Sequence, residues 1–221
     1  RLVGSEMCIR DRLYRERYRP GRGVAHLVSE DEPQSFGFLA DQVFLADAFL
    51  EAYVTTHLRE YLVKAEIITA DLIDQLEDKQ SGGFYDRVPD TSAKGLLKFP
   101  HKDLAMNASL SILFSDLYYM THKTKYHDYA EQTLQFLLSY PGPLPTAVTG
   151  RAINRFLEYP IQIVVVGEQS DAKAQKLFSK GLEVYAPGKL VRFLDPQVDQ
   201  LSIGAVSFPL IKETRAYICT D

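Results

Sequence analysis

The chain has 221 residues, of which 46% are hydrophobic and 24% charged, and this composition is that of an ordinary globular protein. The formal net charge of -4, with no basic stripe, lacks the electrostatic signature of a nucleic-acid-binding protein. No apolar run approaches the roughly 20 residues of a transmembrane helix, and the two cysteines form neither a disulfide framework nor a zinc motif. We therefore expect a cytoplasmic protein with no metal or cofactor, and with neither nucleic acid nor a membrane as its partner.

Residues 1–12 stand apart from the rest of the sequence. The run RLVGSEMCIRDR shows neither helical nor strand periodicity, and it resembles translated adapter sequence. We expect a non-native segment here and exclude it from the prediction of the fold. At the other end, the strand-like run 216–221 has no turn after it, and we expect the chain to be a fragment of a longer protein.

The next part of the chain is predicted to be helical, because apolar residues recur at three- and four-residue spacing. A glycine-containing loop at 79–91 interrupts this pattern, and Pro141 ends the last helix of the series, since proline cannot continue a helix. The predicted helices cover 39–56, 59–76, 106–120 and 125–140.

An internal repeat with an offset of 65 residues relates these helices to one another. Residues 44–66 align with 109–131, and the matched pairs include Leu45/Leu110, Phe49/Phe114, Tyr53/Tyr118, His57/His122 and Tyr61/Tyr126. A single helical hairpin cannot bury both of its apolar faces, so hairpins of this kind stack side by side. The repeat therefore predicts a mainly α fold, an incomplete α/α toroid that covers residues 13–160 and ends with a further helix at 145–157.

After Pro160 the pattern changes from helical to mixed. The continuous β-branched run at 161–166 is typical of a strand that is buried on both faces. A predicted helix at 171–181 and a strand at 190–194 complete a parallel strand–helix–strand unit, and 216–220 is expected to add a third strand. We therefore expect a small α/β appendage over 161–221, without a phosphate-binding loop, because the first strand is followed by the lone Gly167.

Candidate ligand-binding residues lie where the predicted inner helices begin. Inner helices of such a toroid direct their unpaired N–H groups toward one end of a central cavity, which favours hydroxyl or anionic groups there. Asp41 and Gln42 open the first inner helix, and the repeat makes Gln42 equivalent to Asn107 in the second. We expect Asp41 to transfer protons, and Gln42 and Asn107 to bind a ligand. The alternative is that Asp41 and Asn107 are helix N-caps, which their residue types favour.

Two loops add further candidates. In GGFYD at 82–86 the glycines permit unusual backbone conformations, and we expect Tyr85 to contact a ligand and Asp86 to transfer protons; the alternative is a structural turn anchored by a buried Phe84. Ahead of the second inner helix, His101 is a candidate general acid or base that a nearby carboxylate would orient, with the alternative of a solvated loop histidine. Two neighbours are candidate ligand contacts, Lys102 and Asp103.

Four segments together resemble a known family. The segments are GFLADQ (37–42), GGFYD (82–86), LLKFPHKDLAMNAS (96–109) and EYPIQIVVVG (158–167). In order and spacing they are similar to the C-terminal part of the thioredoxin-domain-containing protein family that includes spermatogenesis-associated protein 20 and YyaL. The resemblance implies a thioredoxin-like domain, absent from this chain, followed by a six-hairpin α/α barrel of the glycosidase type.

Two hypotheses of function follow. In the first, the toroid binds or processes a carbohydrate, with Asp41, Asp86 and His101 in proton transfer and Gln42, Tyr85 and Asn107 in ligand positioning. In the second, the helices are a non-catalytic scaffold that supports the absent thioredoxin-like domain or another partner. An apolar, plugged cavity would favour the scaffold, and a polar, open cavity with a carboxylate of raised pKa would favour the enzyme.

Overall fold

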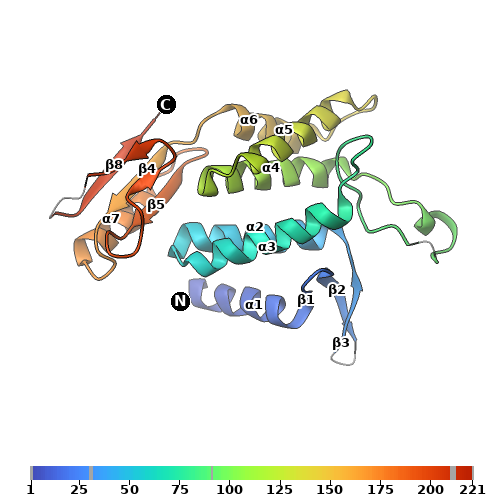
Figure 1. The fold of residues 1–221 in the computed structure, drawn as a ribbon, viewed down its shortest axis with the longest axis horizontal. Helices are drawn as coiled ribbons and strands as arrows, with labels where there is room; N and C mark the ends of the chain where they lie inside the picture. Colours follow the sequence, from blue (N-terminus) through green and yellow to red (C-terminus); the bar gives the residue numbers. More distant parts are fainter. Residues whose placement is uncertain (1, 30–31, 91, 210–212, 221) are drawn as a thin grey trace.

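The structure of the chain is a computed structural model that describes residues 2–29, 32–90, 92–209 and 213–220. Its main body is a set of antiparallel helical hairpins (Figure 1), formed in chain order by α2 (Leu39–Thr56), α3 (Arg59–Leu76), α4 (Leu104–Thr121), α5 (Thr124–Ser139) and α6 (Thr146–Leu157). Helix α4 contacts both α2 and α6, whereas α3 and α5 pack on the helices that precede them. The parallel helices α2, α4 and α6 therefore form an inner row.

The two predicted hairpins adopt the same local structure. His57 and His122 end α2 and α4 in the left-handed conformation, with φ of 61° and 55°. Their N–H groups donate to the carbonyls of Tyr53 at 2.8 Å and Tyr118 at 2.7 Å, respectively. This geometry confirms the repeat and shows that both histidines are turn residues.

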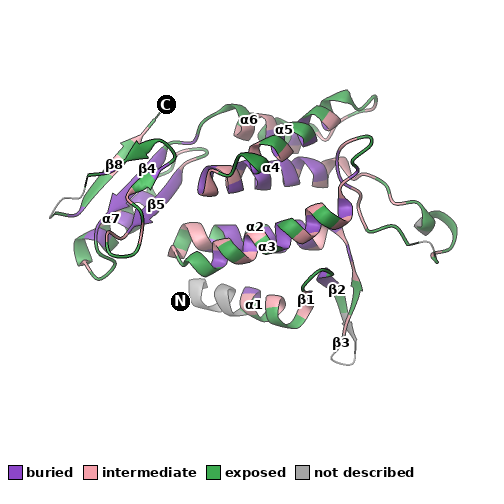
Figure 2. Cartoon of the chain, viewed as in Figure 1, coloured by how far each residue is buried: buried purple, intermediate pink, exposed green. Residues whose placement is uncertain are grey.

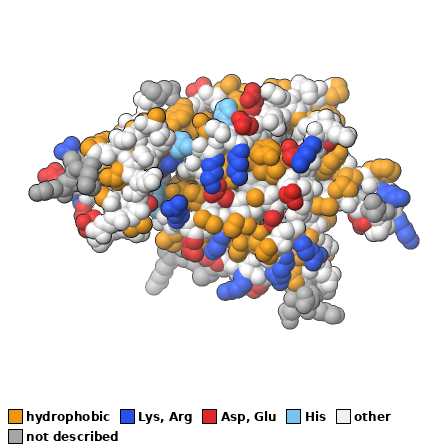
Figure 3. Space-filling view, viewed as in Figure 1, with side chains coloured by type: hydrophobic (Ala, Val, Ile, Leu, Met, Phe, Trp, Pro, Cys, Tyr) orange, Lys and Arg blue, Asp and Glu red, His pale blue; other side chains and the backbone are white. Residues whose placement is uncertain are grey.

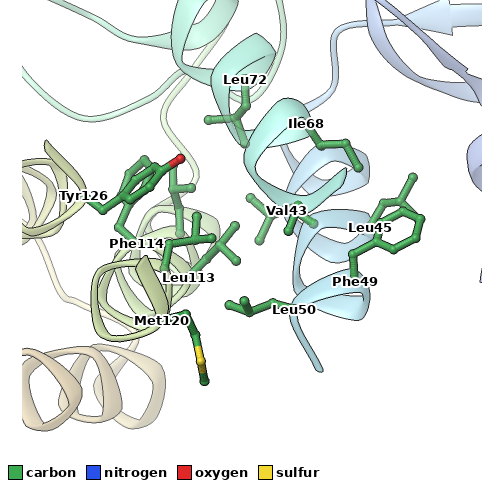
Figure 4. Close-up of a cluster of buried hydrophobic side chains, with 14 of the residues drawn as sticks. Val43, Leu45, Phe49, Leu50, Ile68, Leu72, Leu113, Phe114, Met120 and Tyr126 are labelled. Atoms are coloured by element: carbon green, nitrogen blue, oxygen red, sulfur yellow. The ribbon is translucent and has the colours of Figure 1, made fainter. Parts of the chain in front are cut away.

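The two hairpins also share one hydrophobic core, as the repeat predicts (Figure 4). Phe114 of α4 is fully buried and lies in the same cluster as Phe49 of α2, Ile68 of α3 and Tyr126 of α5. Figure 2 shows that α4 is buried over most of its surface, which is the environment expected for a helix with neighbours on several sides.

The N-terminal part differs from the sequence-based expectation. Helix α1 spans Leu2–Arg17 and so includes most of the segment that the sequence analysis left out of the prediction of the fold. It is followed by a three-stranded antiparallel sheet of β1 (Tyr18–Arg19), β2 (Gly23–Ser29) and β3 (Glu32–Phe36), which the sequence analysis did not predict.

The α/β unit contains the predicted parallel pair, β4 (Gln162–Val166) and β5 (Leu190–Leu194), joined by α7 (Ala172–Glu183). The third predicted strand, β8 (Arg215–Cys219), pairs with the other edge of β4 and is antiparallel to it. One face of this sheet packs on α7, and the other packs near a short hairpin of β6 (Ser202–Ile203) and β7 (Val206–Ser207). A 3-10 turn, η1 (Gly95–Lys98), lies in the loop between α3 and α4.

The repeated turn residues connect this unit to the helical body. His57 Nε2 accepts the N–H of Phe193 at 2.5 Å, and Arg192 Nη2 donates to the carbonyl of Tyr119 in the last turn of α4. Leu190 of β5 is buried in the same core as the helices. Burial lowers the pKa of His57 to about 4, and the nearby Arg192 guanidinium acts in the same direction. The imidazole is therefore neutral, as a hydrogen-bond acceptor must be at Nε2.

Figure 3 shows that acidic, basic and hydrophobic side chains are interspersed on one face of the molecule, without a field of a single sign. Within the described part of the chain, no helix combines the length and the apolar character needed to cross a bilayer.

Candidate functional site

The repeat-equivalent amides at the starts of α2 and α4 bind backbone. Asn107 is fully buried; its Oδ1 accepts the N–H of Phe84 at 2.7 Å, and its Nδ2 donates to the carbonyls of Phe84 at 2.9 Å and Asp103 at 2.8 Å. Gln42, 1% exposed, accepts the N–H of Val24 through Oε1 at 3.2 Å. Both side chains thus hold the segment that precedes their own helix.

The N-caps also differ from the alternative interpretation of these positions. The N-cap of α4 is Asp103, whose carboxylate accepts the N–H groups of Ala105 at 2.9 Å and Met106 at 3.0 Å. The N-cap of α2 is Phe38, which makes no side-chain cap bond. Asp41 and Asn107 therefore lie in the first turns of their helices and are not caps. The Asp103 carboxylate is hydrogen-bonded to backbone N–H groups of the first turn of α4.

Tyr85 and Lys102 converge on Asp78 at the end of α3. Tyr85 Oη donates to Asp78 Oδ2 at 2.9 Å, and Lys102 Nζ forms an ion pair with the same oxygen at 2.8 Å. Burial alone would raise the pKa of Asp78, but hydrogen bonds from Lys102, Ser81 and Tyr85 hold it far below its usual range. Phe84 is buried in the hydrophobic core. This geometry agrees with the structural-turn interpretation of the GGFYD loop.

Asp86 and His101 are brought together, as the predicted role of His101 requires. His101 Nδ1 lies 3.0 Å from Asp86 Oδ2, and the N–H of His101 donates to Asp86 Oδ1 at 2.8 Å. The His101 side chain is 69% exposed, so its ring is accessible to solvent. Asp41 pairs instead with His26, whose Nδ1 lies 2.9 Å from Asp41 Oδ2. His26, on β2, was not predicted.

Asp41 and Asp86 lie in different surroundings. Asp41 lines a cavity of about 370 Å³ between α1 and α2, and Asp86 is not among the described residues that line it. Glycoside hydrolysis by two carboxylates requires both on one substrate, about 5 Å apart for retention and more for inversion. The geometry therefore gives no support to joint action of this pair.

A larger and more polar pocket lies farther along the inner helices. Its volume is about 680 Å³, within the range of small-molecule sites. Three inner helices and the segment between α7 and β5 contribute to its walls. The polar side chains at the pocket are Glu51 and Thr55 of α2, Asp116 of α4, Arg151, Asn154 and Arg155 of α6, and Lys189.

The carboxylates of this pocket influence one another. Glu51 is exposed to solvent, but desolvation by the surrounding chain raises its pKa, and the negative charges of Asp47 and Asp116 raise it further against the opposing charge of Arg155. Burial also raises the pKa of Asp116, against the effect of its ion pair with Arg155. Desolvation also raises the pKa of the exposed Asp47, which precedes Glu51 by one helical turn, with Arg151 acting in the opposite direction. A carboxyl group of raised pKa in a cleft is a candidate proton donor.

Comparison with solved structures finds a similar fold. A crystal structure of a family 76 glycoside hydrolase from a bovine Bacteroides thetaiotaomicron strain matches with a TM-score of 0.52 and 18% sequence identity. The match covers 68% of this chain and 36% of that protein, so this chain spans about a third of the length of the hydrolase. The fold is a partial glycosidase-type α/α toroid. No family model and no curated protein matches the sequence.

The pocket carboxylates were missed in the sequence analysis, although the repeat carries a signal for them. The offset of 65 residues that relates the hairpins makes Glu51 equivalent to Asp116. Acidic residues at equivalent positions of the two inner helices indicate a shared polar lining. The N-terminal ends of the helices drew the prediction instead, because helix dipoles favour ligands there. Among the described residues, no group of three or more His, Cys, Asp or Glu side chains could hold a metal ion.

Proposed function

We propose that the helical body binds and processes a carbohydrate in the polar pocket between α2, α4 and α6. The observation that carries this proposal is the pair of repeat-equivalent carboxylates, Glu51 and Asp116, on neighbouring inner helices at one pocket. A polar, open pocket of this kind also favours ligand binding over a purely structural scaffold. The likeness of the fold to a family 76 glycoside hydrolase agrees with the choice of ligand class.

In this proposal Glu51 is the proton donor. Its raised pKa keeps a larger fraction of the acid form near neutral pH, which general-acid protonation of a leaving oxygen needs. Asp116 is the second carboxylate, and its ion pair with Arg155 through Oδ1 fixes its orientation. Arg151 and Asn154 of α6, both exposed, supply hydrogen-bond donors for sugar hydroxyls.

The residues at the N-terminal ends of the helices have unequal support. Asp41, Asp86 and His101 stay proposals for proton transfer, with the accessible Asp86–His101 pair as the supporting observation. Ligand contacts from the remaining candidates lack such support, because each side chain binds within the chain through at least one polar atom; these are Gln42, Tyr85, Asn107, Lys102 and Asp103.

We also propose that the chain belongs to the thioredoxin-domain-containing family and occurs in the cytoplasm. The support is the order and spacing of the four sequence segments at 37–42, 82–86, 96–109 and 158–167. In this setting the thioredoxin-like domain would be the partner of the toroid within a longer protein.

The test is a binding screen of the chain against neutral hexoses, pentoses and their short oligosaccharides, with saturation-transfer NMR and calorimetry as readouts. We expect at least one sugar to bind to the wild type, and Glu51→Gln or Asp116→Asn to weaken that binding about tenfold, equivalent to about 1.4 kcal/mol. The control is Glu60→Gln, an exposed residue on the outer helix α3, which should bind as the wild type does. Absence of binding across the panel, or unchanged binding by both pocket variants, would refute the proposal.

A further inference from the structure

Arg155 contacts both the helical body and the α/β unit. Its Nε and Nη2 atoms donate to Asp116 Oδ1, and its Nη1 donates to the carbonyl of Gly188 at 2.7 Å. The guanidinium also lies 5.1 Å from the centre of the Tyr119 ring. With 13% of its side chain exposed, Arg155 joins a pocket carboxylate to a backbone group of the α/β unit.

The Gly188 carbonyl belongs to a turn, Ala186–Lys189, that is fixed on both sides. The N–H of Lys189 donates to the carbonyl of Ala186 at 3.2 Å, which closes the turn. Lys189 Nζ donates to the last carbonyls of α7, including Gly181 at 2.8 Å and Leu182 at 2.6 Å. The next residue, Leu190, is buried among the inner helices. The turn is therefore held by α7 on one side and by the helical core on the other.

Gly188 permits the close approach of this turn to Arg155. Its φ of +68° lies in the left-handed region, which glycine adopts without strain. A Cβ at this position would lie 3.2 Å from Arg155 Nη1, which is closer than ordinary van der Waals contact. An alanine here would therefore displace either the turn or the guanidinium.

We propose that the turn Ala186–Lys189 is a specificity-determining wall of the carbohydrate pocket, and that Arg155 is the positioning residue that fixes this wall relative to Asp116. The inference rests on the proposed function of the pocket. Pro187, Gly188 and Lys189 all line it, together with side chains of α2, α4 and α6. A rigid wall at this place limits the length of the saccharide that fits, so the α/β unit takes part in substrate selection.

The experiment compares Gly188→Ala and Arg155→Lys with Gly150→Ala as a matched control. Gly150 lies on the same helix as Arg155, and a Cβ there would meet nothing within 4 Å. For a sugar that the wild type binds, affinities for the monosaccharide and the trisaccharide are measured by calorimetry. We expect both test variants to change the ratio of these affinities at least fivefold, and the control to keep it within twofold. A ratio that both test variants leave unchanged overturns the proposal while sugar binding by the toroid stands.

A second readout does not depend on any sugar. Solvent exchange of the Arg155 Nη1–H, followed by NMR, should be at least tenfold faster in Gly188→Ala than in Gly150→Ala, because this group donates to the Gly188 carbonyl and the turn no longer holds it. Equal exchange rates in the two variants overturn the positioning role, even if the wild type binds no sugar and the proposed function itself fails. Arg155→Lys keeps the positive charge, so it separates loss of the fork geometry from loss of charge.

Discussion

The fully buried amide of Asn107 is predicted to be one of the most important polar groups for the stability of the helical body. Asn107→Ala would remove the partner of the Phe84 N–H and a donor to the Phe84 carbonyl. Both backbone groups would then be buried without these partners. The carbonyl of Asp103 would keep its helical hydrogen bond from the N–H of residue 107, so it adds little to the loss.

The magnitude follows from these two groups. Leaving a buried donor or acceptor unpaired costs about 1–3 kcal/mol, so Asn107→Ala should lower the free energy of unfolding by about 4 kcal/mol. The equivalent Gln42→Ala removes a single, longer hydrogen bond to Val24 and should lower it by about 1–2 kcal/mol. Asn154, exposed on α6, gives a control substitution to alanine with an effect below about 0.5 kcal/mol.

Urea denaturation followed by circular dichroism measures all three differences, provided that the slope with denaturant is shared. The order of destabilisation should be Asn107→Ala, then Gln42→Ala, then Asn154→Ala. The reasoning is refuted if Asn107→Ala lies within about 1 kcal/mol of the control, a difference smaller than one unpaired buried group.

Three further predictions concern the turn, the cap and the core. Burial lowers the pKa of His57 to about 4 in the folded chain, whereas the unfolded value is about 6.5; stability should therefore be fully present above pH 6.5 and fall by about 3 kcal/mol as the pH drops to 4. His57→Asn, which tolerates the left-handed turn, should remove this slope in urea titrations at each pH, and an unchanged slope would contradict the assignment. Asp103→Ala should lower the unfolding free energy by about 1 kcal/mol, since the α4 cap is lost, and exposed Asp128→Ala is its control. Phe114→Ala should cost about 3–5 kcal/mol by leaving a cavity in the shared core, and a thermal melt within 2 °C of the wild type would argue against that packing.

Helical parts of this fold were predictable because their signals are local. The bounds predicted for the first hairpin agree with α2 (Leu39–Thr56) and α3 (Arg59–Leu76), where apolar spacing and breakers coincide. The β-branched run before Gly167 likewise predicted the buried strand β4. The β1–β3 sheet was missed because β1 has only two residues and β3 is polar, and because the central strand β2 is held by contacts with α1 and α2. Contacts between elements that are distant in the sequence cannot be predicted from the periodicity of one segment.

The same distinction between local signals and tertiary contacts applies to the candidate site. The sequence analysis expected a carboxylate near His101 without naming it, and in the structure this carboxylate is Asp86. The pocket lined by Glu51 and Asp116 was not expected, because the two residues lie on different helices and meet at one pocket only when these helices adjoin. The direction of the Asn107 side chain was also beyond the sequence, since a polar residue in a first helical turn can bind either a ligand or the backbone.

The origin of Glu51 and Asp116 in two copies of one hairpin has a consequence for how this protein can change. The distance between these two side chains depends on the interaxial distance of adjoining inner helices, about 8–10 Å. It does not depend on any connecting loop. Insertions or deletions in the surrounding loops can therefore reshape what enters the pocket while the acidic pair keeps its geometry. Mutations that change the ligand preference should therefore occur mainly in connecting segments such as Ala186–Lys189, while the helical framework is retained.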